Sequence, residues 1–340
     1  MSKHDNFKLR NFRADDFDAF HALVSDYDVV KMLGTWPYPA DPEFTRMRMN
    51  TPEAQAGMVN VVECDGQLAG TIGLVNGGIG YNFAKPFWGR GLATWAARTK
   101  IRQGFLEYGL DKITAGAHQL NPASAAVLMK SGLRKVGEDT AYCKARDREL
   151  SGDRFELSRA DWAAHQPLLI ETERLRIEPF ENADATALSE LMNDEAITRM
   201  MQTIPLPFTP VQAADWIAKR PFEGKVGFVA KISLKDGTLI GFIGLGGDPV
   251  NVAYALGRKF WGQGYITEAM LAFLNHVTKT FALDEITAGA FADNPASQRV
   301  LGKLGFERTG QKMHKATSRL EEAQLFLYRL RRSQPLGQLL

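Results

Sequence analysis

The sequence predicts an α+β fold that occurs twice in tandem, each copy a mixed, mostly antiparallel sheet flanked by helices. Two pentapeptides, Phe-Trp-Gly-Arg-Gly at 87–91 and Phe-Trp-Gly-Gln-Gly at 260–264, are each followed by Asn-Pro-Ala-Ser, at 121–124 and 294–297. Both pairs are offset by 173 positions, and residues 110–117 match 283–290 at the same offset. A repeat period this long indicates duplicated domains rather than solenoid units.

Length and composition support two ordinary globular domains. At 340 residues the chain exceeds the ~150 residues typical of one domain. Its 45% hydrophobic and 24% charged residues, with no apolar run of ~18 residues, exclude a membrane protein. The N-terminus lacks an apolar signal segment, and Cys64 and Cys143 form no paired or metal-ligand motif, so we expect a cytoplasmic protein without a metal site. A formal charge of +2 with mixed signs gives no support for an obligatory nucleic-acid partner.

The repeat sets the expected domain boundaries. We expect a first copy at 1–157, a linker at 158–171, a second copy at 172–330 and a frayed tail at 331–340. The linker is predicted because residues 163–167 show no periodic pattern.

Each copy is expected to begin with a strand and a helix, followed by a loop rich in proline and aromatic residues where helix cannot continue. A hairpin follows, because an Asp-Gly turn lies between alternating apolar residues. The expected ranges are 7–10, 15–23, 36–39 and 59–74 in the first copy, and 175–177, 183–192, 204–208 and 227–245 in the second.

The remainder of each copy predicts a short strand, the glycine turn, a long helix, a strand, a second helix and terminal strands. The expected ranges are 79–83, 92–108, 113–117 and 123–130, and then 252–256, 266–281, 286–290 and 296–303, with the last strand ending near Leu330. Strands that are first antiparallel and then joined through helices predict a mixed sheet.

The glycine turns are candidate phosphate sites. Gly262 and Gly264 follow a strand and open a helix, where backbone N–H groups and the helix dipole hold an anion, and Gly89 and Gly91 repeat the pattern. For a single such motif, a tight turn that needs positive φ is the better explanation. Its repetition with the same downstream partner favours phosphate binding.

These motifs together resemble the GNAT superfamily of acyl-coenzyme A dependent N-acetyltransferases, in particular the ribosomal-protein N-terminal acetyltransferases. The family motif Q/R-x-x-G-x-G/A corresponds to Lys-Phe-Trp-Gly-Gln-Gly at 259–264 and to Pro-Phe-Trp-Gly-Arg-Gly at 86–91, and both depart from it at the first position. The resemblance extends to residues 174–176, 294–297 and 300–306.

The resemblance implies an enzyme that transfers an acetyl group from acetyl-coenzyme A to a primary amine, by direct attack in a ternary complex. The acceptor would be a small-molecule or peptide amine. The alternative is an acyl-coenzyme A binding sensor without turnover, or a tandem in which only one copy is active.

The resemblance also implies the cofactor-binding residues, because the pantetheine arm pairs with the strand before the glycine turn. In the second copy they are Tyr254, Ala255, Leu256, Lys259, Trp261, Gly262, Gln263, Gly264, Tyr265, Asn294, Arg299 and Lys303. In the first copy they are Phe83, Trp88, Gly89, Arg90, Gly91, Leu92 and Asn121. Arg299 and Lys303 either reach the adenosine 3′-phosphate or form a solvated basic face.

The implied catalytic residues are Asn294 with Ser297 and Asn121 with Ser124. By resemblance the Asn bonds the pantetheine arm, and the Ser protonates the leaving thiolate. Spacing at a helix start equally predicts that the Asn is the N-cap and the Ser a first-turn residue.

A general base is harder to place, because neither strand before the glycine turn carries a carboxylate. His118 is the candidate in the first copy, since its ordinary pKa of ~6.5 suits proton transfer. Phe291 takes its place in the second copy, which leaves Asp293, Asp248 or a chain of waters.

Aromatic residues of the proline loops, Trp36, Tyr38 and Phe208, either wall an acceptor pocket or pack on their own domain. Duplicated domains of equal length usually pack about a pseudo-two-fold axis, so we expect an intrachain pseudo-dimer.

Overall fold

The computed structural model describes residues 6–331, so the predicted tail lies outside the described residues except for Arg331. The chain divides into two compact units between Trp162 and Ala163, and each unit is described by itself.

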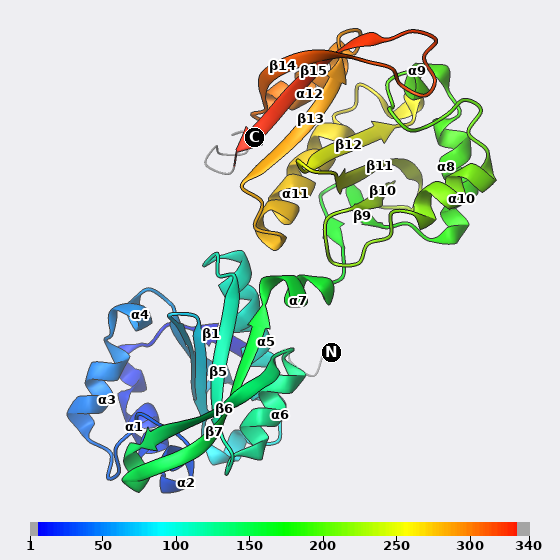
Figure 1. Ribbon diagram of the computed structural model, residues 1–340. Coiled ribbons are helices and arrows are strands. Elements are labelled where there is room, and N and C mark those ends of the chain that lie inside the picture. The colour runs from blue at the N-terminus through cyan, green and yellow to red at the C-terminus, as the bar shows by residue number, and fades with distance from the viewer. Residues whose placement is uncertain (1–5, 332–340) are drawn as a thin grey trace. The chain divides into compact units, whose positions relative to one another are not determined.

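The N-terminal unit contains one mixed sheet (Figure 1). Its strands are β1 (Phe7–Arg10), β2 (Val59–Cys64), β3 (Gln67–Val75), β4 (Gly78–Phe83), β5 (Lys112–His118), β6 (Arg134–Cys143) and β7 (Arg148–Ser158). Its α-helices are α1 (Phe17–Ser25), α2 (Tyr27–Val30), α3 (Pro42–Met49), α4 (Pro52–Gln55), α5 (Leu92–Leu106), α6 (Pro122–Lys130) and α7 (Arg159–Ala164), the last of which crosses the division. The strand order is β1-β2-β3-β4-β5-β7-β6, and only β4 and β5 are parallel.

The C-terminal unit repeats this arrangement with one added strand. Its strands are β8 (Ile170–Glu171), β9 (Leu175–Pro179), β10 (Phe228–Leu234), β11 (Leu239–Gly246), β12 (Asn251–Leu256), β13 (Glu285–Phe291), β14 (Glu307–His314) and β15 (Ala323–Arg331). Its helices are α8 (Ala185–Met192), α9 (Glu195–Thr198), α10 (Pro210–Ala218), α11 (Tyr265–Thr280) and α12 (Pro295–Lys303). The order is β14-β15-β13-β12-β11-β10-β9-β8, and β12 and β13 form the parallel pair.

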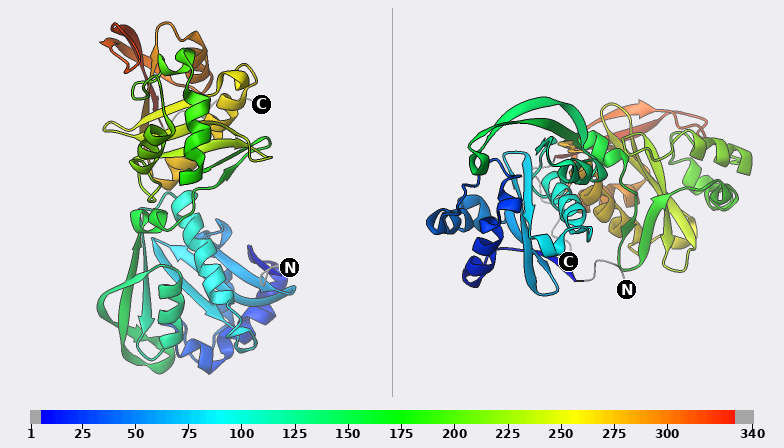
Figure 2. Two further views of the ribbon diagram at one scale, coloured as in Figure 1. Left: turned by 90° about the vertical axis from the view of Figure 1, so that its right-hand side faces the viewer. Right: turned by 90° about the horizontal axis from the view of Figure 1, so that it is seen from below.

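Helices cover both faces of each sheet, which confirms the predicted α+β class. In the C-terminal unit, α11 buries Met270, Phe273 and Val277 at helical spacing against one face. On the other face, α8 and α10 pack against Val229 and Phe242. In the N-terminal unit, the cyan helix α5 crosses its own sheet in the same way (Figure 2).

The expected strands and long helices agree with the structure to within a few residues, but short helices after the proline loops were not predicted. Helix α10 has a capping box between Thr209 and Gln212, with Pro210 at its first position. Helix α3 begins similarly after Asp41, whose carboxylate accepts the Glu43 N–H at 2.9 Å. Caps and a proline at the first helical position were the available signals.

Residues 158–171, the expected linker, contain regular structure. Helix α7 occupies much of the segment, and β8 pairs with β9 through Ile170 and Ile177. Leu168 and Ile170 are buried in the core of the C-terminal unit. The pattern was missed because the apolar residues are too few to reveal a period.

These contacts predict where an autonomous C-terminal fragment must begin. We expect residues 163–331 to fold alone, whereas 172–331 loses Leu168 and Ile170, each worth roughly 1.5–3 kcal/mol of burial. Thermal unfolding of both fragments tests this. Equal melting temperatures would show that the preceding segment contributes nothing to the C-terminal core.

Candidate active site

A gap between two parallel strands lies at the centre of each candidate site. Strands β12 and β13 pair only at Asn251 and Thr287, and β4 and β5 pair only at Gly78 and Thr114. Beyond that point β12 is still paired with β11, but its other edge is open through Leu256. Buried backbone N–H and C=O groups need partners, so this open edge suits an extended amide-containing ligand.

The glycine turn lies at the end of the open edge, and its conformation requires glycine. Gly262 and Gly264 have φ of 75° and 80°, and Gly89 and Gly91 have 74° and 81°. Helix α11 begins directly after Gly264, so its free N–H groups adjoin the turn.

Two contacts fix the turn in the C-terminal unit. The Trp261 indole N–H donates to the Leu256 carbonyl at 2.8 Å, as Trp88 does to Phe83 at 2.7 Å in the other unit. Arg174 also donates to the Gln263 carbonyl at 3.1 Å and pairs with Glu268 at 2.6 Å. No sequence pattern predicts this role of Arg174, because its partners are about ninety residues away.

Asn294 caps α12, as its position at a helix start predicts. Its Oδ1 accepts the Ser297 N–H at 3.0 Å, and Asn121 accepts the Ser124 N–H at 3.1 Å. The Asn294 Nδ2 makes no hydrogen bond within residues 6–331. Capping uses the oxygen and leaves the nitrogen for a ligand carbonyl.

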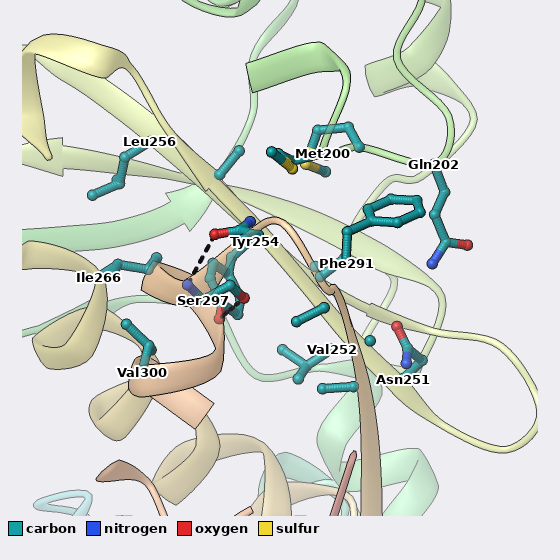
Figure 3. Close-up of a pocket in the computed structure, with 18 of the residues that line it drawn as sticks. Met200, Gln202, Asn251, Val252, Tyr254, Leu256, Ile266, Phe291, Ser297 and Val300 are labelled. Carbon is teal, nitrogen blue, oxygen red and sulfur yellow. Dashed lines mark hydrogen bonds between the residues drawn. The ribbon is translucent and has the colours of Figure 1, made fainter. Parts of the chain in front are cut away.

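A tyrosine bonds the serine in both units. A hydrogen bond of 2.8 Å joins Tyr254 Oη to Ser297 Oγ (Figure 3), and one of 3.0 Å joins Tyr81 Oη to Ser124 Oγ. Burial raises the pKa of Tyr254 and of Tyr81 to about 12. Both phenols therefore stay protonated at neutral pH and are available as proton donors.

Each tyrosine–serine pair borders a cleft, of about 1730 Å³ in the C-terminal unit and about 1180 Å³ in the N-terminal unit. Most expected site residues line these clefts: Tyr254, Ala255, Leu256, Trp261, Gly262, Gly264, Tyr265, Asn294, Ser297, Arg299 and Lys303, and Phe83, Trp88, Gly89, Gly91, Leu92, His118, Asn121 and Ser124. Lys259, Gln263 and Arg90 do not line them. Arg90 instead pairs with Asp65 at 3.1 Å.

The two clefts differ in the basic residues that line them, and the C-terminal cleft has more. Arg258, Arg299 and Lys303 line it. In the N-terminal unit the residue equivalent to Arg299 is Ala126. Lys85, equivalent to Arg258, pairs with Asp26 and Asp28, whereas Arg258 approaches one carboxylate, that of Asp194, at 3.9 Å.

His118 is buried in the wall of the N-terminal cleft, and its Nδ1 has no hydrogen-bond partner within the described residues. Burial and the charge of Arg146 lower its pKa below 6.5, so the ring is neutral at pH 7. A neutral imidazole with an unpartnered nitrogen can accept a proton.

Asp293, a candidate base, forms ion pairs with two arginines. It bonds Arg319 at 2.8 Å and Arg199 at 2.9 Å, and the bond from Arg319 lowers the pKa of its carboxyl. Asp248 does not line the cleft.

Arg319 also joins the β14–β15 connection to the loop after α9. Its Nε donates to the Arg199 carbonyl at 2.7 Å, and the equivalent Arg146 donates to the Lys31 carbonyl at 3.0 Å. Met200 and Phe291 lie at this end of the C-terminal cleft (Figure 3).

The proline-loop aromatics differ in placement. Trp36 lines the N-terminal cleft although it is buried, Phe208 packs in the C-terminal core, and Tyr38 is exposed and lines neither cleft. No cluster of potential metal ligands occurs among residues 6–331. No helix in that range is long and apolar enough to cross a bilayer.

Comparison with known proteins identifies the class. The acetyltransferase (GNAT) domain family matches residues 6–134 and 174–307, so the chain belongs to the GNAT acetyltransferase family, with one domain in each half. N-acetyltransferases of this family use acetyl-coenzyme A and act on amines.

Individual relatives each match about half of the chain. The uncharacterized N-acetyltransferase p20 of Bacillus licheniformis is 29% identical over 46% of this chain and 92% of its own. Spermidine N(1)-acetyltransferase of Escherichia coli K12 is 28% identical over 41% and 78%. Among solved structures, ribosomal-protein-S5-alanine acetyltransferase from Vibrio fischeri has a TM-score of 0.40 and 18% identity, covering 49% of this chain and 100% of its own.

Proposed function

We propose that the protein transfers an acetyl group from acetyl-coenzyme A to a primary amine by direct attack in a ternary complex. The observation that carries this proposal is the open edge of β12, bordered by the glycine turn and the Tyr254–Ser297 pair. The chain's residues fit the cofactor: Gly262 leaves open space for a phosphate, and Asn294 Nδ2 lacks a partner.

Each part of the site then has one task. The free N–H groups before α11 hold phosphate, and the open edge of β12 holds the pantetheine amides. When bound, acetyl-coenzyme A supplies the thioester that the amine attacks. A β12 N–H stabilises the developing oxyanion, since a fixed donor there costs no reorganisation.

Proton transfers use the remaining groups. Ser297 Oγ–H donates to the leaving thiolate and regains a proton from Tyr254, and solvent then returns a proton to the phenol. In the N-terminal unit, Ser124 and Tyr81 act in the same way, and His118 removes the amine proton. The C-terminal unit has Phe291 at that position, so its acceptor must arrive neutral or lose its proton to water.

Thiol release from acetyl-coenzyme A with a panel of amines tests the proposal, with calorimetric titration of coenzyme A alongside it. Amine-dependent release supports catalysis. Binding without release would favour the alternative, a non-catalytic acyl-coenzyme A sensor.

The role of His118 predicts a pH dependence for the N-terminal site, measured with the C-terminal site silenced by Gly262→Val. Because the pKa of His118 is lowered, the neutral base persists at pH 7, and kcat/KM shows an inflection below pH 6.5 in addition to the one that the acceptor amine contributes. His118→Gln should lower activity by roughly 10²-fold and remove that inflection. An unchanged pH profile in His118→Gln would exclude it as the base.

A further inference from the structure

An unpaired arginine lines the C-terminal cleft at the end remote from the glycine turn. The Arg220 guanidinium lies 4.9 Å from the centre of the Trp216 ring, and its Nη1 donates to the Trp216 carbonyl at 3.0 Å. It forms no ion pair with any carboxylate of residues 6–331. The nearby Asp215 is already bonded to Lys219 at 2.7 Å.

The surroundings of Arg220 make the missing partner costly. The residue is half-buried, and burial lowers the pKa of its guanidinium below the usual value. An arginine does not lose its proton at ordinary pH, so this charge remains, and an anion bound beside it would compensate for its partial burial.

A second donor in the same wall also lacks an acceptor. Trp216 is buried, and its Nε1 has no hydrogen-bond partner among the described residues. Trp216 packs edge-on against Phe242 at 4.9 Å. The Arg220 guanidinium, which lines the cleft, donates only, so a ligand group that binds it must be an acceptor.

These donors and α11 belong to opposite faces of the sheet. Trp216 belongs to the core on the α8 and α10 face of the sheet, whereas α11, which follows the glycine turn, packs on the opposite face. Arg220 nonetheless lines the same cavity as Tyr254 and Ser297. A ligand that contacts Arg220 therefore occupies the same cavity as the Tyr254–Ser297 pair.

We propose that the acceptor of the C-terminal site is amino-acid-like, with a carboxylate beside the amine that Arg220 binds. This inference rests on the proposed function. The planar guanidinium fork matches a carboxylate, and one arginine balances its single charge. The exposed Lys312, which lines the cleft, adds to a field that repels polyamines.

The test compares leucine, leucinamide, leucyl-aspartamide and spermidine in a Gly89→Val background, which silences the N-terminal site. Leucinamide has the more readily deprotonated amine, so chemistry alone favours it over leucine. We expect kcat/KM for leucine to exceed that for leucinamide about tenfold. Preference for leucyl-aspartamide would assign the carboxylate to a peptide side chain and contradict the free amino acid.

Variants at Arg220 test whether this residue binds the carboxylate of the acceptor. Arg220→Met should lower kcat/KM for leucine by roughly 10- to 100-fold, mainly through KM, and leave leucinamide unchanged. Arg220→Lys keeps the positive charge but loses the planar guanidinium, so its kcat/KM for leucine should lie between those of the parent and of Arg220→Met. Lys225→Met removes an exposed cation paired with Glu223 outside the cleft and should change nothing.

Binding of N-acetylleucine in the presence of coenzyme A gives a readout independent of turnover. We expect Arg220→Met to weaken it at least about tenfold. Equal affinity, preference of the parent for spermidine or leucinamide, or an equal loss on leucine and leucinamide would each overturn the inference. Failure of every amine to release thiol would instead contradict the proposed function, and the binding comparison would still decide the role of Arg220.

Discussion

The Gly262→Val variant is expected to lose coenzyme A binding at the C-terminal site, so that calorimetric stoichiometry falls from two sites to one. Gly262 has a φ of 75°, and a Cβ built there meets no protein atom within 4 Å. The side chain would therefore project into the space at the start of α11 that a phosphate needs. Valine is also strained at this φ, because it is β-branched.

A matched control separates lost binding from backbone strain. Gly237, in the β10–β11 turn, has a φ of 90° and equally open surroundings, but it does not line the cleft. Gly237→Val should lower stability without changing the stoichiometry. If Gly262→Val still binds coenzyme A at two sites with unchanged affinity, the glycine turn does not bind the phosphate and has a structural role alone.

Features carried by consecutive residues were predictable from the sequence. The glycine turn needs positive φ, and the Asn-Pro-Ala-Ser motif is a strong helix start, so both could be placed without knowledge of distant contacts. The Asp65–Gly66 turn likewise fixed β2 at its observed bounds.

Contacts between distant segments could not be predicted. Ser297 lies 43 residues from Tyr254, and Arg319 lies 120 from Arg199, and no periodicity connects either pair. The missing partner of Arg220 also depends on the placement of every nearby carboxylate. Such relations arise from the way the sheet and its helices pack, which single-sequence patterns do not encode.

The two interpretations of Asn294 are compatible. Its Oδ1 caps α12, while Nδ2 is available to a ligand. The cap fixes the rotamer, so a donor is already oriented before any ligand binds. A helix-cap motif can therefore also be a binding motif, and spacing alone could not have separated the two.

Ser297→Ala, measured in the Gly89→Val background, should lower kcat by about 10²-fold with little change in the affinity for acetyl-coenzyme A. The serine hydroxyl is joined to Tyr254, whose pKa of about 12 keeps it protonated, so the pair holds a proton at the place where the thiolate forms. Alanine removes the hydroxyl, but the Ser297 N–H bond to Asn294 uses the backbone and survives.

Tyr254→Phe provides the graded comparison for this prediction. It leaves Ser297 in place without its proton source, so kcat should fall less than in Ser297→Ala. Both losses should shrink at low pH, where solvent protonates the thiolate more readily. A structural role predicts instead that Ser297→Ala weakens cofactor binding and lowers the melting temperature. Unchanged turnover in Ser297→Ala would reduce the serine to an ordinary first-turn residue of α12.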